Sequence, residues 1–400
     1  MLIVAVDTFP PTRVDVSVLF GRELAGRGHK IDWLLQSEAA CARAFTVEWG
    51  GGRIWVAPTD LGGSLLRRIR KHVLGIAYDL RLFTLLRRGG YDIVEVKDKF
   101  VSGVFALVAA RLFHKRFVYW LSYPFPEDYL YRATLGGRYS FLYWIRGTTF
   151  RMLLYRLLLP RADHVFVQSD QMRQDVAAHG VPLAKMTAVP MGIEMDTERE
   201  AAPLTERAVI PRDEPAIVYL GALARARQID LLVRVLAEVR VIVPGAKLYL
   251  VGRGDDPADE QFLLEEARKL GVLDAVVFVG QRPRPEALAY VRDADVCVSP
   301  IPPSPMFRAA SPTKLVEYMA MGKPVVANDH PEQRLVIEQS GAGYCVPWEE
   351  HEFTRAIVEL LNSPEQAAAM GERGRRYVIE HRAYDKIADV VENQLLALVR

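Results

Sequence analysis

The sequence predicts an α/β protein with two domains, each built on a doubly wound parallel sheet. Short apolar runs bounded by turn residues alternate with amphipathic patterns along the chain. This alternation is typical of parallel strands joined by right-handed helical crossovers. The 400 residues exceed what a single hydrophobic core usually supports, so the length favours two domains.

The first half contains candidate strands with helices between them. The helical patterns are VSVLFGRELAGRGH, SGVFALVAARLF and QMRQDVAAHG. The strands are LIVAV (from Leu2), IDWLL (from Ile31), YDIVEV (from Tyr91), RFVYWLS (from Arg116), DHVFVQS (from Asp163) and MTAVP (from Met186). Residues 194–214 are polar, contain prolines and have no clean period, so they are the best linker candidate.

The same cycle restarts after this stretch. The strands are AIVYLG, AKLYLVG, AVVFVG, DVCVSP, PVVA and GYCVPW, and the helices between them include IDLLVRVLAEVR, DEQFLLEEARKLG and PEALAYVRDA. We therefore expect one domain at residues 1–195 and a second at residues 196–383. Ligands of open α/β sheets bind at the carboxyl edges of the strands, so two such domains leave a cleft there.

The bulk composition excludes several classes of protein. Half of the residues are hydrophobic and a quarter are charged, and the net charge of +2 gives no reason to expect nucleic acid as a partner. The three cysteines, Cys41, Cys297 and Cys345, are too few and too scattered for a disulfide framework or a zinc site. The chain opens as a buried strand rather than a signal peptide. No apolar run approaches the ~20 residues of a membrane span, so we expect a cytoplasmic protein.

Glycine and basic residues follow several predicted strands of the second half. Gly221 ends one strand, and Arg225 and Arg227 come just before the next helix. Backbone N–H groups and arginines at a helix start suit a pyrophosphate, although solvated arginines beside a tight turn give the same pattern. Gly252 in LYLVGRGDD and Arg282 in VGQRPRPEALAY are weaker signals, because isolated glycine turns are mostly structural.

The strongest signal is SPTKLVEYMAMGKPVVA, which begins at Ser311. If a helix begins at Pro312 or Thr313, Lys314 lies in its first turn, where the helix dipole favours anions. A diphosphate between the lysine and the helix start removes this mismatch. Glu317 lies one turn deeper on about the same face, where it could accept hydrogen bonds from ribose hydroxyls. The alternative is an ordinary Lys–Glu pair on a solvated helix face.

The chain resembles the GT-B glycosyltransferases of family four, a large group of retaining enzymes. The resemblance covers nearly the whole length. It is carried by RADHVFVQSDQMRQDVAAHGVPLAKMTAVPMGIE, YLGALARARQID, the turn at Gly252, VVFVGQRPRPEALAYVRDADVCVSP and above all SPTKLVEYMAMGKPVVA. It implies two Rossmann-like domains facing across a cleft, with a nucleotide-sugar donor held by the second and an acceptor on the first. It also implies that a C-terminal helix of about residues 384–400 packs back on the first domain.

The resemblance also implies roles for individual residues. Arg227 matches the basic residue that neutralises the donor diphosphate, Lys314 should approach the same phosphates, and Glu317 matches a glutamate that holds the ribose. Fixed cations would stabilise the departing diphosphate without a metal ion, and no cofactor is implied beyond the nucleoside diphosphate sugar. The remaining expected donor-binding residues are Gly221, Arg225, Gly252, Arg282, Ser311 and Thr313.

Several positions depart from the family pattern. Ala309 stands where the first glutamate of the signature is expected, and Ala222 where an arginine is usual. The loop FPPTRVD lacks the paired glycines of the family, and Ser122 replaces a histidine. These last two changes indicate a divergent acceptor, a different catalytic arrangement using Glu127 or Asp128, or lost activity. The acceptor-side candidates are Arg13, Asp98, Ser122 and Glu127.

Two stretches of the first half combine arginines with aromatic and aliphatic residues. They are residues 65–88 and RYSFLYWIRGTTFRMLLYRLLLPR from Arg138. Such helices suit an anionic membrane surface, and ordinary helices with a solvated basic face give the same pattern. Because both stretches lie in the expected acceptor domain, they favour a lipid-linked acceptor and a peripheral position at the inner membrane face.

The sequence therefore predicts a glycosyltransferase that moves a hexose from a nucleoside diphosphate sugar to a saccharide or lipid-linked acceptor. The expected pathway is the synthesis of a cell-surface polysaccharide or glycolipid. Two alternatives stay open. One is a nucleotide-sugar epimerase of the same architecture, and the other is a non-catalytic nucleotide-sugar-binding partner of a membrane assembly.

Overall fold

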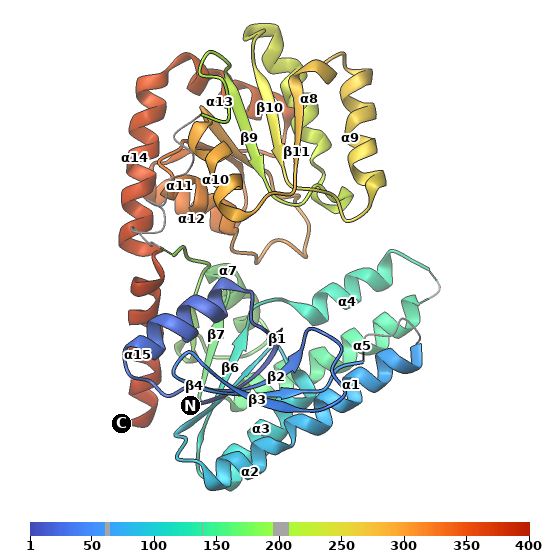
Figure 1. Cartoon of the computed structure of the whole chain (residues 1–400), viewed down its shortest axis with the longest axis vertical. Coiled ribbons are helices and arrows are strands. Elements are labelled where there is room, and N and C mark those ends of the chain that lie inside the picture. Colours follow the sequence, from blue (N-terminus) through green and yellow to red (C-terminus); the bar gives the residue numbers. More distant parts are fainter. Residues whose placement is uncertain (61–64, 138, 195–207) are drawn as a thin grey trace. The chain divides into compact units, whose positions relative to one another are not determined.

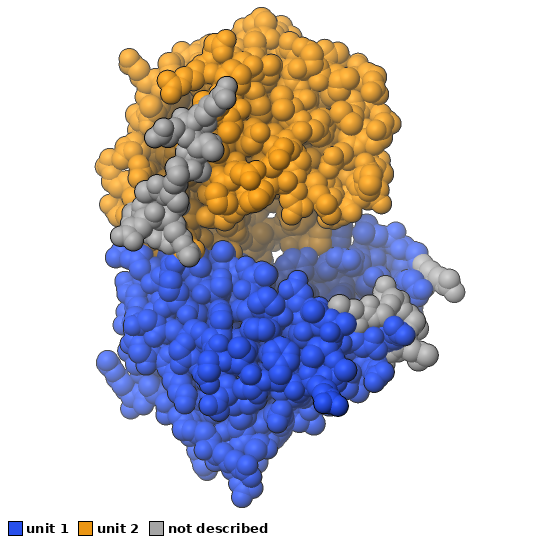
Figure 2. Space-filling view, in the orientation of Figure 1, with its two compact units in different colours: residues 1–190, 384–400 blue, residues 191–383 orange. Residues whose placement is uncertain are grey.

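The computed structural model describes residues 1–60, 65–137, 139–194 and 208–400 (Figure 1). They form two compact units, one of residues 1–190 with 384–400 and the other of residues 191–383 (Figure 2). The predicted domain boundary and residues 195–207 of the predicted linker lie outside the described residues. Within the described ranges, no helix combines the length and apolar composition needed to cross a membrane.

The first unit is built on a sheet with the strand order β3-β4-β2-β1-β5-β6-β7-β8. Its strands are β1 (Leu2–Phe9), β2 (Asp32–Ser37), β3 (Phe45–Trp49), β4 (Gly52–Ala57), β5 (Ile93–Lys97), β6 (Arg116–Leu121), β7 (His164–Val167) and β8 (Met186–Ala188). Neighbouring strands are parallel except β3 and β4, which are antiparallel. The strands predicted for the first half are confirmed, and the β3–β4 hairpin is an addition to them.

The strand order of the first unit reverses between β1 and β5. β1 pairs with β2 on one side and with β5 on the other. Ligands of open parallel sheets bind outside the carboxyl ends of the strands at such a reversal. The chain leaves these two strands after Phe9 and after Lys97, so the loops that follow them are the expected site of the first unit.

Helices cover both faces of this sheet (Figure 1). The C-terminal helix of the chain belongs to this unit and packs on its N-terminal helix, and Phe20 and Val391 of these two helices share a core cluster. Arg27, just after the N-terminal helix, forms an ion pair with Glu392 of the C-terminal helix, with 2.7 Å between Nη1 and Oε2. The helices are η1 (Asp15–Leu24), α1 (Leu65–Asp79), α2 (Arg81–Arg88), α3 (Phe100–Leu112), α4 (Phe125–Thr134), α5 (Ser140–Met152), η2 (Leu153–Leu158), α6 (Leu159–Arg161), α7 (Asp170–Ala177), η3 (Leu183–Lys185) and α15 (Tyr384–Val399).

The second unit is built on a parallel sheet with the order β11-β10-β9-β12-β13-β14. Its strands are β9 (Ala216–Leu220), β10 (Lys247–Val251), β11 (Val276–Gly280), β12 (Val296–Ser299), β13 (Val325–Asn328) and β14 (Gly343–Val346). All of them coincide with predicted strands. The order reverses between β9 and β12, so the expected site of this unit lies in the loops after Leu220 and Ser299.

Both faces of the second sheet are covered by helices. Leu232 and Leu236 pack on one face, and Leu315 and Tyr318 pack on the other. The helices are η4 (Arg225–Arg227), α8 (Asp230–Ile242), α9 (Pro257–Lys269), η5 (Leu273–Ala275), α10 (Arg284–Asp293), α11 (Thr313–Ala320), α12 (Pro331–Ser340), α13 (Glu350–Asn362) and α14 (Pro364–His381).

Candidate functional site

Glycine turns lie next to one another where β9, β10 and β11 end. Their φ angles are +151° at Gly221, +145° at Gly252 and +76° at Gly280. The N–H of Gly221 donates to the carbonyl of Val251 at 2.9 Å, and that of Gly252 donates to the carbonyl of Gly280 at 3.0 Å. L side chains rarely adopt such angles, so glycine is needed where the backbone turns. The absence of side chains at these positions also lets a ligand approach the backbone closely.

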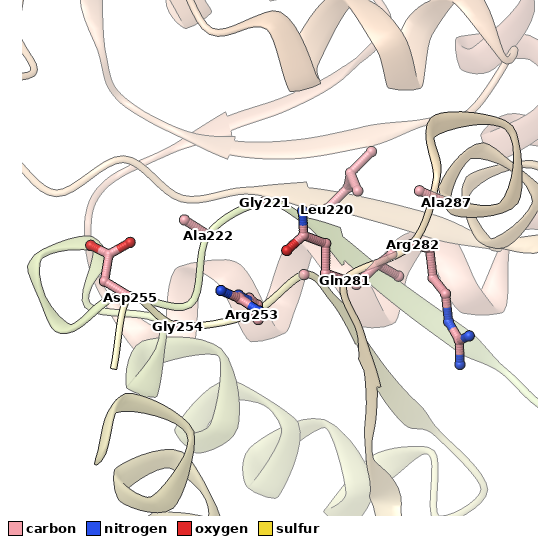
Figure 3. A pocket seen from close by; sticks show the side chains of 11 residues that line it. Leu220, Gly221, Ala222, Arg253, Gly254, Asp255, Gln281, Arg282 and Ala287 are labelled. Atoms are coloured by element: carbon pink, nitrogen blue, oxygen red, sulfur yellow. The ribbon is translucent and has the colours of Figure 1, made fainter. Parts of the chain in front are cut away.

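A pocket of about 430 Å³ opens beside these turns (Figure 3). In Figure 3, Arg253 lies between Asp255 and Gln281, and Arg282 extends its guanidinium away from the turn at Gly221. Arg253 was not among the sequence candidates, although it directly follows a glycine that was. The lining residues are Leu220, Gly221, Ala222, Val251, Gly252, Arg253, Gly254, Asp255, Gln281, Arg282 and Ala287.

Lys314, near the start of α11, approaches the turn at Gly221. Its ammonium lies 4.1 Å from the ring centroid of Tyr219, and a Cβ added at Gly221 would be 3.3 Å from its Nζ. Burial, together with the positive charge of Arg227, lowers the pKa of Lys314 to about 7. Helix α11 has no side-chain cap at its N-terminus, so its dipole adds to the positive potential there.

Arg227 follows the same glycine turn, at the end of η4. Its guanidinium lies over the ring of Phe307, 4.7 Å from the centroid. Its charge is close enough to lower the pKa of Lys314. The structure thus brings Gly221, Arg227 and Lys314 together. The two neighbouring cations repel each other, and an anion bound next to both would offset this repulsion.

Glu317 lies one turn further along α11 and pairs with Arg284. The distance from Nε of Arg284 to Oε1 of Glu317 is 3.3 Å. Burial raises the pKa of Glu317, and the charge of Arg284 opposes this rise. Arg284 was not predicted from the sequence, because its partner lies on a different helix. The pair holds the Glu317 carboxylate in one position next to the Lys314 site.

Other predicted donor-binding residues have partners within the second unit. Thr313 is the first residue of α11. The hydroxyl of Ser311 accepts a hydrogen bond from the N–H of Met191 at 2.9 Å. Arg225 stacks over the ring of Phe262, 4.6 Å from its centroid. Ser311 and Arg225 therefore support the local structure, whichever ligand the site takes.

Two residues at the end of β13 and just after it hold the segment that carries Phe307, and neither was predicted from the sequence. Nε2 of His330 donates to the carbonyl of Phe307 at 2.8 Å. The side chain of Asn328 binds the backbone N–H and C=O of Ile301 at 2.7 and 2.9 Å. The polar run NDHPEQ after a buried strand was a signal that could have found them. Ala309 lies in the same segment and is buried. Because it is an alanine, this position has no carboxylate to offer a ligand.

In the first unit, charged side chains gather where the strand order reverses. Nζ of Lys97 lies 2.7 Å from Asp15 and 3.4 Å from Asp7. Arg13 binds both carboxylate oxygens of Asp15, at 3.0 and 2.9 Å. Burial opposes the ionisation of Asp15, but the charges of Lys97 and Arg13 outweigh it and hold its pKa below the usual value. These pairs fix the guanidinium of Arg13 at the edge of the sheet.

Asp98 and Ser122 extend this charged cluster. Asp98 accepts hydrogen bonds from the N–H of Ser122 at 2.9 Å and from its hydroxyl. Nη1 of Arg13 donates to the same hydroxyl oxygen at 3.4 Å. Asp98 has a φ of +56°, and burial raises its pKa to about 6. The structure therefore joins Arg13, Asp98 and Ser122, whereas the carboxylate of Glu127 is buried near Tyr155.

Known proteins share this architecture. Residues 203–377 match the family described as "Glycosyl transferases group 1", and residues 18–192 match the "Glycosyl transferase 4-like domain". The sucrose-phosphate synthase of Thermosynechococcus elongatus has the same fold, with a TM-score of 0.73 and 21% identity over 99% of each chain. The two doubly wound units are therefore a GT-B fold.

Two curated relatives extend the comparison. The glycogen synthase of Mycobacterium tuberculosis is 26% identical over 284 residues, which is 70% of this chain and 64% of that protein. The GDP-mannose-dependent alpha-(1-6)-phosphatidylinositol monomannoside mannosyltransferase of Mycolicibacterium smegmatis is 32% identical, over 55% of this chain and 58% of that protein. This chain thus spans about three fifths of the length of these relatives. It belongs to the GT-B glycosyltransferases of family four.

Proposed function

We propose that the protein transfers a hexose from a nucleoside diphosphate sugar to an acceptor hydroxyl, with retention of the anomeric configuration. One observation carries the proposal. Lys314 lies beside the bare backbone turn at Gly221, and Arg227 is close enough to act on its charge; Gly221 itself lines a pocket of about 430 Å³. Two fixed cations next to a helix N-terminus suit a diphosphate. The names of the two relatives support the same chemistry.

In this reaction the bond between the anomeric carbon and the diphosphate oxygen breaks, and its electron pair stays on the oxygen. Lys314 and Arg227 offset the negative charge that develops there. Such an interaction is stronger in the transition state than in the ground state, so it accelerates the chemical step. Glu317, held by Arg284, would accept hydrogen bonds from the ribose. The acceptor oxygen bonds to the same carbon on the face that the diphosphate leaves, and the proton of the acceptor hydroxyl passes to the departing diphosphate oxygen.

We propose that the reaction needs no metal ion or further cofactor. The two side-chain cations and the uncapped N-terminus of α11 supply positive charge at the diphosphate. Within the described ranges, no group of three histidine, cysteine or carboxylate side chains is placed to hold a metal ion. Turnover should be the same before and after treatment with EDTA. A loss that Mg²⁺ or Mn²⁺ restores would overturn this part of the proposal.

We propose that the acceptor binds at the Arg13, Asp98 and Ser122 cluster of the first unit. The cluster offers the guanidinium of Arg13, with 41% of its side chain accessible, backed by the buried hydroxyl of Ser122 and the buried carboxylate of Asp98. This mixture of donors and acceptors suits the hydroxyls of a saccharide. The mannosyltransferase relative is named for a phosphatidylinositol mannoside acceptor, which supports a lipid-linked saccharide.

A binding and transfer experiment tests the proposal. Thermal unfolding is followed with UDP, GDP and ADP, and a nucleotide that binds the native protein raises the midpoint by mass action. The matching nucleotide sugar is then supplied, and the released sugar or product is analysed by NMR for its anomeric configuration. Stabilisation without any hydrolysis or transfer would indicate a binding protein. An inverted product would contradict retention, and the absence of stabilisation by every nucleotide would contradict the donor site.

We expect the affinity for a nucleoside diphosphate to fall as the pH rises above about 7. Burial and Arg227 hold the pKa of free Lys314 at about 7, and a bound anion must raise it. Binding then takes up a proton, so above the free pKa the affinity declines by up to about tenfold per pH unit until the bound pKa is reached. Calorimetry across this range measures the slope. The Lys314→Met variant should keep only the nucleotide's own titration, and equal slopes in both proteins would contradict the assignment.

We expect Asp98→Asn to raise the acceptor KM by roughly tenfold and to leave nucleotide affinity unchanged. Asparagine tolerates a positive φ and can accept the N–H bond of Ser122, so the fold should persist. The variant loses the negative charge beside Arg13, which weakens hydrogen bonds to acceptor hydroxyls. Kinetics with varied acceptor and calorimetry with nucleotide separate the two effects. Asp92→Asn, at the exposed opposite end of β5, is the control, and an equal KM in both variants would place the acceptor elsewhere.

A further inference from the structure

The helical hairpin of α4 and α5 carries an exposed apolar surface. We call it the hairpin surface and define it by large apolar side chains of residues 139–152. Their exposed fractions run from 41% to 70%. Monomeric soluble proteins rarely expose this many large apolar groups in one contiguous segment. The members are Tyr139, Phe141, Leu142, Trp144, Ile145 and Met152.

The packing of α5 on α4 leaves the side of α5 opposite Gly147 uncovered. Gly147 is buried, and a Cβ there would lie 2.8 Å from Cγ of Leu130, so α4 occupies this side of α5 closely. Tyr129 of α4 also stacks on Tyr143, with centroids 6.3 Å apart. With 3.6 residues per turn, Ile145 is about half a turn from Gly147. Figure 1 shows α4 and α5 running side by side at the margin of the first unit.

The charge around the hairpin surface has one sign. Residues 129–162 contain no aspartate or glutamate. Arg146 lies over the ring of Tyr129, 4.4 Å from its centroid. Burial lowers the pKa of His72 in α1, and the charges of Arg146 and Lys71 lower it further, so α1 adds basic residues beside α5. The exposed arginines of the segment are Arg132, Arg146, Arg151, Arg156 and Arg161; Arg138 lies outside the described residues.

We propose that the hairpin surface docks on an anionic lipid surface. Tryptophan and tyrosine favour the headgroup region, where the apolar ring is buried and the polar edge stays hydrated. Arginines beside them bind lipid phosphates. A second copy of this chain is a poor occupant, because a twofold contact of the surface with itself sets arginines against arginines with no carboxylate in the segment. The proposal goes beyond sugar transfer and does not depend on the donor site.

Of the two stretches singled out in the sequence, the structure favours the second. Among the described side chains of α1, α2 and the residue between them, the large apolar ones with notable exposure are Val73 at 58% and Leu80 at 44%, and these are separated along the chain. The α1 helix therefore contributes basic charge next to the hairpin surface.

Vesicle flotation tests the docking. The full chain should float with phosphatidylcholine vesicles that contain phosphatidylglycerol, and binding should fall at high salt because lipid charge is screened. The double variant F141S/W144S should bind at least about tenfold more weakly. The matched control is V241S/I242S, which removes two apolar side chains that are 83% and 58% exposed on α8 of the second unit and should leave binding unchanged.

Trp144 reports the contact directly. All six tryptophans lie in described ranges, and Trp144 is the exposed one. Its fluorescence should be quenched by lipids brominated near the headgroup, and W144F should lose this quenching. A circular dichroism spectrum and a thermal unfolding transition like those of the wild type would show that each variant is folded. Absence of flotation at low salt, or equal flotation of F141S/W144S and the wild type, would overturn the proposal. So would self-association that the double variant abolishes without any lipid binding.

Discussion

Replacing Lys314 by methionine should lower turnover by about 100- to 1,000-fold, the usual effect of removing one preorganised charge from a transition state. Methionine keeps an unbranched apolar side chain but removes the ammonium that lies over the Tyr219 ring and beside Gly221. Because the leaving diphosphate gains charge as the bond breaks, kcat should fall more than the affinity for substrate. Steady-state kinetics with the nucleotide sugar identified by thermal unfolding measures both effects.

The same variant should unfold at the same or a higher temperature than the wild type. The pKa of Lys314 falls from 10.5 to about 7 in the folded protein, so below pH 10.5 the unfolded chain holds the proton more strongly. The charged lysine therefore costs stability at neutral pH, and methionine removes that cost. Lys269→Met, at a lysine whose side chain is 75% exposed, is the control and should change neither property. Turnover within about threefold of the wild type would remove Lys314 from the mechanism.

Most of the fold was predictable because most strands are buried apolar runs bounded by turns. The strands of the second unit are of this kind, and all were expected. The β3–β4 hairpin was not, because β3 is mostly exposed and lacks the apolar run on which the prediction depends. The only feature of the sequence that indicated the hairpin was GGG between two segments in which apolar and polar residues alternate, a pattern typical of a hairpin turn.

The candidate donor site was predictable in outline because the topology of a doubly wound sheet fixes where loops converge. Gly221 follows β9, and Lys314 begins the helix after β12, so the reversal between these strands brings them together. Pairings between side chains on different elements were not predictable. Arg284 reaches Glu317 from α10, and Ser311 is bound to Met191, 120 residues away in sequence. Spacing along one chain segment carries no information on such contacts.

Replacing Gly252 by alanine should destabilise the second unit by roughly 2–5 kcal/mol. A Cβ at this position would lie 2.0 Å from the carbonyl oxygen of Gly221 and 2.9 Å from its carbonyl carbon. Both atoms are backbone, so no side chain can rotate away. The φ of +145° also lies outside the range that alanine adopts easily. Denaturant or thermal unfolding with a probe in the second unit measures the loss.

Gly280→Ala separates the two causes. Gly280 ends the neighbouring strand with a φ of +76°, and a Cβ there meets no atom within 4 Å. This variant should lose only the roughly 1–2 kcal/mol of a left-handed alanine. The difference between the variants is then the cost of forcing the ends of β9 and β10 apart where a Cβ at Gly252 would meet the carbonyl of Gly221. If Gly252→Ala were no less stable than Gly280→Ala, the turns would not be packed as the structure has them.

The same two variants, Gly252→Ala and Gly280→Ala, also test the donor site. To accept a Cβ at Gly252, the turn at Gly221 must move, and Lys314 lies beside that turn. Gly252→Ala should therefore lose nucleotide stabilisation even at temperatures where the second unit is still folded. Gly280→Ala should keep it, because nothing near its added Cβ needs to move. That result would show that the lack of a side chain at Gly252 is needed both for close backbone packing and for diphosphate binding.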